Sequence, residues 1–202
     1  MTVRIPLLRA AALVVPVAMA AQTSPSFDYP TCMAEAMGQF EADLAAANSR
    51  APAPNVEIVS RDAVQYCGTL AVVACDRSAA PLACQDDLAD RQQVLRRAIL
   101  NAVPDPAEVT GLDPVWSDRL YPQLWAVAHG TSAGPDCAGA DDVYVAWCRT
   151  WQANLKVSEA VILWQVARVL GAAPSGVEAG WIAPPSPMRP MERPSREGEE
   201  TE

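Results

Sequence analysis

Apolar residues along the chain recur mostly at helical spacing, and the alternation that is typical of strands is scarce. A first helix is predicted from about Thr31 to Ala47, because apolar residues return there every three or four positions along one face. That apolar stripe consists of Met33, Met37, Phe40 and Leu44.

A second helix is predicted to start at Ser60, whose hydroxyl can cap the free amides of a first turn. Gly68 and the apolar run at 70–73 would also fit a short buried strand. A third helix is expected between Pro81 and Pro104. The buried positions expected in these two helices are Val64, Cys67, Ala71 and Cys75, followed by Cys84, Leu88, Leu95, Ile99 and Ala102.

A fourth helical segment follows Asp113 and ends before Gly130, with Pro122 expected to kink or split it. The longest helix is capped by Asp141 and reaches residue 170; its second half, 160–170, is apolar nearly all round and is therefore predicted to be the buried centre. Its first half is expected to point these residues inward: Tyr144, Trp147, Cys148, Trp151 and Leu155. The fold class predicted is all-α, a small disulfide-stapled domain of four to five helices around a buried C-terminal helix.

The first twenty residues have the three parts of a cleavable secretory signal. Arg4 and Arg9 supply positive charge, residues 10–17 are uncharged and apolar, and small residues precede the expected cleavage after Ala20. The apolar run is too short to span a bilayer. We therefore expect a signal peptide at 1–20, a helical domain at 21–171, and a product that is periplasmic or secreted and does not span the membrane.

Residues 172–202 are rich in proline and charge and poor in aliphatic side chains, so they are predicted to form a flexible acidic tail. An alternative is a docking peptide in which Trp181 provides an aromatic anchor beside Pro184 and Pro185.

Six cysteines in an exported chain indicate three disulfides, although six allow fifteen pairings. Cys67 and Cys75 on one helix would lie about 12 Å apart along its axis, too far for a bridge. Cys75 and Cys84 flank a predicted turn, and Cys137 lies in a predicted loop before the helix that carries Cys148. We favour the pairs Cys32–Cys67, Cys75–Cys84 and Cys137–Cys148.

The chain has 202 residues and a formal net charge of −9, which becomes −11 when Arg4 and Arg9 leave with the signal. An acidic surface disfavours nucleic-acid partners and suits a basic one. Apart from Lys156 every basic residue other than histidine is arginine, and alanine is abundant, which favours a GC-rich bacterial source.

No catalytic or cofactor motif is present, and the absence of C-x-x-C pairs argues against zinc binding and thiol redox chemistry, so no metal or cofactor is expected. The single histidine, His129, precedes the glycine that ends its helix and is interpreted as a capping residue. Asp86 with Asp90, or Asp141 with Asp142, could serve a glycan hydrolase that uses paired carboxylates. Both pairs also fall where a helix start favours negative charge.

Tryptophan is abundant for this length, and Trp147, Trp151 and Trp181 are candidates for a binding surface. The alternative is that Trp147 and Trp151, which are four residues apart, fill the core. The run from Cys84 to Asp90 resembles the cysteine, leucine and aspartate spacing of lysozyme-inhibitor-like envelope proteins over seven residues, without the later tryptophan–arginine–aspartate–cysteine segment of that family. The resemblance assigns no residue roles.

The sequence therefore predicts an exported, non-enzymatic protein that binds another protein or an envelope component, with a basic partner suiting its charge. The alternative functions are a cell-wall glycan hydrolase that uses paired carboxylates, or an inhibitor of such a hydrolase.

Overall fold

The computed structural model describes residues 27–49, 59–131, 134 and 136–184, and these residues form α-helices and one π-helical turn but no strand. The all-α prediction is confirmed. The predicted signal peptide at 1–20 lies outside the described residues. The elements are α1 (Tyr29–Asn48), α2 (Asp62–Asp76), α3 (Pro81–Asn101), α4 (Pro106–Val109), the π-helical turn η1 (Trp116–Leu120), α5 (Tyr121–His129) and α6 (Asp142–Val169).

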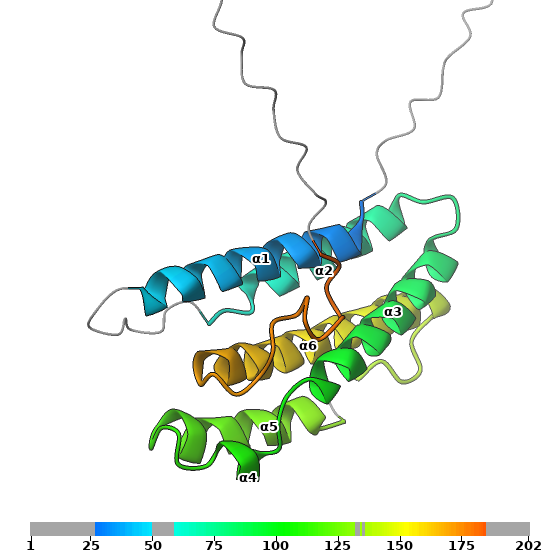
Figure 1. Ribbon diagram of the computed structural model, residues 1–202. Helices are drawn as coiled ribbons and strands as arrows, with labels where there is room; N and C mark the ends of the chain where they lie inside the picture. The colour runs from blue at the N-terminus through cyan, green and yellow to red at the C-terminus, as the bar shows by residue number, and fades with distance from the viewer. Residues whose placement is uncertain (1–26, 50–58, 132–133, 135, 185–202) are drawn as a thin grey trace, which may run out of the picture.

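Helix α6 is the central element, in contact with α2, α3 and α5 (Figure 1). Helix α1 packs directly on α2 and reaches α6 through the rings of Phe40 and Trp164, whose centroids are 5.3 Å apart. The second half of α6 is largely buried, as predicted, and Val157, Ala160, Val161 and Leu163 are completely covered. An element that is apolar all round needs neighbours on every side, which determines the arrangement of the other helices.

The first half of α6 differs from the prediction at one position. Cys148 is buried and Trp147 and Trp151 are half-buried, but Tyr144 is 45% exposed. Its ring stacks on Trp147 at a centroid distance of 5.4 Å, so it gains contact area at the surface instead of in the core.

Proline and capping residues place several helix boundaries. The side chain of Asp141 accepts a hydrogen bond from the Tyr144 amide at 2.8 Å and starts α6, as expected. The fourth segment is divided next to Pro122, as expected: η1 ends at Leu120 and α5 begins at Tyr121, with Pro122 in its first turn. The short α4 is an addition, since Asp105 caps the Ala107 amide and Pro106 occupies the first helical position.

All six cysteines lie among the described residues and form the three predicted bridges. Cys32–Cys67 joins α1 to α2, Cys75–Cys84 joins α2 to α3, and Cys137–Cys148 ties a loop to α6. Disulfides persist in oxidising compartments, so this pattern is consistent with an extracellular or periplasmic location. None of the described helices is long and apolar enough to cross a membrane.

Alanine at two helical glycines is expected to change the free energy of unfolding in opposite directions. Gly38 is exposed on α1 and an added Cβ meets no atom within 4 Å, so Gly38→Ala should stabilise the fold by about 0.5–1 kcal/mol. Gly68 is buried in α2 against the side chain of Asn154, which a Cβ would overlap, so Gly68→Ala should destabilise by about 1–3 kcal/mol. Urea denaturation measures both, and either sign reversed would contradict this packing.

Candidate functional site

Residues 172–184 fold back on the helical domain, and we call them the C-terminal hook. Gly171 takes a left-handed conformation with φ of 70°, which ends α6 and turns the chain round. The Trp181 and Ile182 amides both donate to the Gly176 carbonyl at 3.1 Å, which closes a tight loop. A Cβ at Gly176 would lie within 3.0 Å of both the Trp181 and Ile182 side chains, so this loop needs glycine there.

The hook comprises the first residues of the stretch that the sequence assigns to a flexible tail beginning at residue 172. Ala173 is 6% exposed and the Trp181 ring packs edge-on against Trp164 at a centroid distance of 4.9 Å. The prediction counted aliphatic residues, but a few apolar anchors and a set of backbone hydrogen bonds are enough to hold this stretch on α6. The rest of the predicted tail, 185–202, lies outside the described residues.

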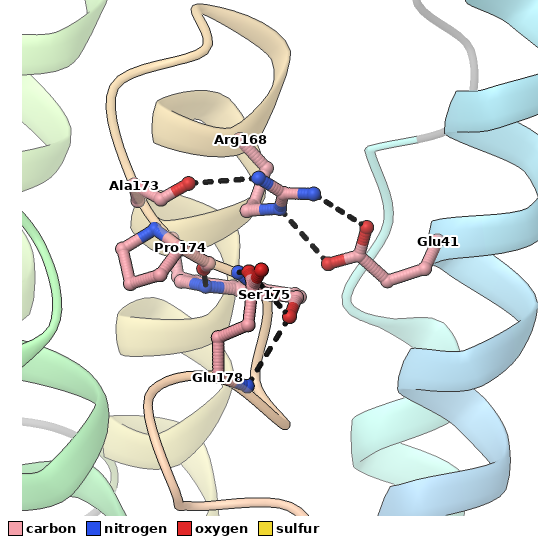
Figure 2. A network of polar contacts seen from close by, with 7 residues as sticks. Glu41, Arg168, Ala173, Pro174, Ser175 and Glu178 are labelled. Atoms are coloured by element: carbon pink, nitrogen blue, oxygen red, sulfur yellow. Dashed lines mark hydrogen bonds and ion pairs between the residues drawn. The ribbon is translucent and has the colours of Figure 1, made fainter.

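A polar network around Arg168 attaches the hook to two helices (Figure 2). The guanidinium donates to both carboxylate oxygens of Glu41 on α1, at 2.9 and 2.8 Å, and to the Ala173 carbonyl at 2.8 Å. The hydrogen bond and charge of Glu41 raise the pKa of Arg168 although partial burial opposes them. One side chain of α6 therefore fixes α1 and the hook in relation to each other.

Two further hydrogen-bond sets define the hook. The Trp164 indole N–H donates to the Pro174 carbonyl at 3.0 Å, so the largest buried side chain of α6 has a partner from the hook. The Glu178 carboxylate accepts from the amide and hydroxyl of Ser175, at 2.9 and 2.8 Å, and these bonds lower the pKa of Glu178 (Figure 2).

The hook, α1 and α3 enclose a groove of about 1290 Å³. Its walls expose large apolar side chains: Val94 of α3 is 57% exposed and Val177 of the hook is 43% exposed. Gly38 faces open space in the wall formed by α1. Other apolar residues that line the groove are Met33, Met37, Leu95, Trp181 and Ile182.

Buried polar atoms also lie at the groove. Burial raises the pKa of the Tyr29 hydroxyl, and the nearby Gln92 side chain offsets this only in part. Among the described residues, the Tyr29 hydroxyl and the Trp181 indole nitrogen find no partner within hydrogen-bonding geometry. Both residues line the groove. A buried polar group without a partner lowers stability, so these two groups call for a structural or functional explanation.

The charged residues of the groove are mostly acidic. Asp28 and Glu35 line it on the α1 side and are exposed, and neither forms an ion pair within the part of the chain that the structure describes. A shallower depression of about 590 Å³ lies farther along α3 and includes Asp87. The two hollows share Asp90 and Arg91, so they form one track along α3.

The three tryptophans predicted as a binding surface are not brought together. Trp147 and Trp151 stack with centroids 5.9 Å apart on the first half of α6, where Tyr144 extends the row. Trp181 lies at the other end of that helix, against Trp164. Trp181 belongs to the groove, but as an edge-on packing partner and not as the free anchor that the docking-peptide alternative required.

The paired carboxylates are occupied by a cation. Arg149 of α6 donates to Asp86 at 2.6 Å and to Asp90 at 2.5 Å, and all three side chains are 42% or more exposed. Both carboxylates are therefore engaged in exposed ion pairs with one guanidinium, and this arrangement gives no support to a division into catalytic acid and base. Asp141 is a helix cap, as its structural interpretation predicts.

His129 occupies the last position of α5, as the capping interpretation requires. Its Nδ1 lies 2.9 Å from the Trp125 carbonyl and its ring stacks on Trp125 at 3.9 Å. Within the described ranges, no group of three or more His, Cys, Asp or Glu residues could hold a metal ion.

The comparisons with known proteins assign no activity to the groove. Neither protein-family models nor curated proteins nor solved structures match this chain.

Removing the hook is expected to destabilise the helical domain. A chain that ends at Gly171 should have a free energy of unfolding about 3 kcal/mol lower than a chain that ends at Pro184, because it loses the packing of Trp181 and the carbonyl partners of Trp164 and Arg168. Denaturation followed by circular dichroism compares the two chains. Equal stabilities would mean that the hook is not part of the folded domain.

Proposed function

We propose that this chain is an exported, non-enzymatic protein that binds an apolar segment of another protein of the bacterial envelope in the groove between α1, α3 and the hook. The observation that carries this proposal is the exposure of Val94 of α3 and Val177 of the hook in the lining of one large groove. Apolar side chains that stay in water beside an open hollow mark a surface that becomes covered on binding.

The site is also pre-organised, which favours a binding site over a loosely packed surface. Two helices and a hydrogen-bonded hook form its walls, and the Arg168 network attaches α1 to the hook. A preformed site reduces the ordering cost of association. The glycan-hydrolase alternative has weaker support, because Arg149 binds both Asp86 and Asp90 at an exposed position.

Export is the second part of the proposal. The arginines, apolar run and small residues at 1–20 fit a signal peptide, and the three disulfides fit an oxidising compartment such as the periplasm or the exterior.

Filling the groove at Gly38 should abolish binding of a small apolar probe. The neutral dye N-phenyl-1-naphthylamine is expected to gain fluorescence with the unmodified protein, and Gly38→Leu should weaken its binding at least tenfold because the added side chain projects into open groove. Ala46→Leu on the exposed surface of α1, away from the groove, is the matched control and should bind as the unmodified protein does. Equal loss in both variants, or no dye binding at all, would contradict the groove as the binding site.

Mass spectrometry of the protein isolated from its host tests export. The mass of the denatured protein is expected to equal that of a chain that begins at Ala21. Thiol labels should appear only after reduction, since all six cysteines are paired. A mass that retains residues 1–20, or thiols that label without reduction, would overturn the assigned compartment.

A further inference from the structure

We propose that the segment bound in the groove is a basic, amphipathic α-helix of a partner protein, with its apolar side chains between α1 and α3 and its cations beside the acidic residues of the track. This inference rests on the proposed function and adds the chemical class of the partner. Three features of the groove support it: size, backbone chemistry and charge.

The size favours a segment of protein. Small-molecule sites have volumes of about 300–1000 Å³. The main groove alone is about 1290 Å³, and it continues into a second hollow of about 590 Å³ along α3. A track of this length accommodates a row of side chains that repeats every three or four residues, which is the row that an amphipathic helix presents.

The backbone chemistry favours a helix over an extended peptide. An extended segment needs partners for its amides and carbonyls, which a sheet edge provides, and the described part of this chain has no strand. A helix satisfies its own backbone and can lie on apolar walls. Met33 and Met37 form part of the α1 wall of the groove, where they are 3% and 1% exposed and belong to the core, so they give a helix an apolar floor.

The charge favours a basic partner. Glu35 and Asp87 are exposed on α1 and α3 and form no ion pair among the described residues, whereas Glu41 and Asp90 are already bound to arginines of α6. Arg91 is the one cation among the residues that line the two hollows. Glu35 lines the apolar groove and Asp87 lines the adjoining hollow along α3, so two unpaired carboxylates on different helices suit a helix that carries cations beside its apolar face.

The probe is a synthetic amidated 18-residue helix of leucine and lysine with one apolar face, compared by calorimetry with a twin in which glutamate replaces lysine. The lysine peptide should bind in a salt-sensitive manner and the glutamate twin at least tenfold more weakly. Gly38→Leu should weaken binding of the lysine peptide at least tenfold, and Ala46→Leu should not change it.

Charge variants distinguish binding in the groove from nonspecific electrostatic attraction to the acidic protein as a whole. Glu35→Gln with Asp87→Asn should weaken binding about fivefold, as expected for two exposed charge pairs. Asp43→Asn with Glu108→Gln removes the same charge from exposed positions outside the groove and should weaken binding less than twofold.

The outcomes also distinguish this inference from the proposed function. Equal weakening by the two charge-variant pairs would overturn the basic-partner inference. The inference would also be overturned if the glutamate peptide bound as tightly as the lysine peptide. If Gly38→Leu still blocked that binding, the groove would remain a binding site. If neither peptide nor the naphthylamine dye binds, both proposals fail together.

Discussion

The second half of α6 has no face that can be left in water, and the rest of the structure is arranged around that constraint. Helices α2, α3 and α5 cover part of it, but Trp164 and Arg168 also carry polar groups that need partners at the side where α1 approaches. The hook supplies the Pro174 and Ala173 carbonyls, and Glu41 supplies the carboxylate. Covering one apolar helix completely therefore also builds the wall of a groove.

The features that depend on neighbouring residues could be predicted from the sequence. Asp141 caps α6, Pro122 splits the fourth segment, and the cysteine pairs follow from which residues share a helix or flank a turn. These outcomes depend on helical geometry over one or two turns. The exposure of Tyr144 could not be predicted in this way. Tyr144 lies on the apolar stripe of α6, but the sequence does not show that the first turn of this helix is exposed among the described residues.

The candidate site depends on contacts between residues far apart in the sequence, and local sequence patterns therefore do not predict it. Glu41 and Arg168 are 127 positions apart, and Arg149 meets Asp86 across 63. Two local hints existed: the apolar pair Trp181 and Ile182 within a proline-rich stretch, and the unusual Gly38 within a helix. Neither specifies a partner, because pairing across the fold is determined by how α1, α3 and α6 pack.

The position of the hook at the end of the described chain has a consequence for the order of assembly. The hook follows α1 to α6 along the chain, so it emerges after them during synthesis and export, and Trp164 and Arg168 gain their partners from the hook only after the helices have emerged. Until residue 184 is free, the nascent helices have an uncovered apolar side where the groove will form. The groove is therefore completed only once the hook has emerged, and a chain truncated at the end of α6 exposes the side of that helix that the finished protein covers.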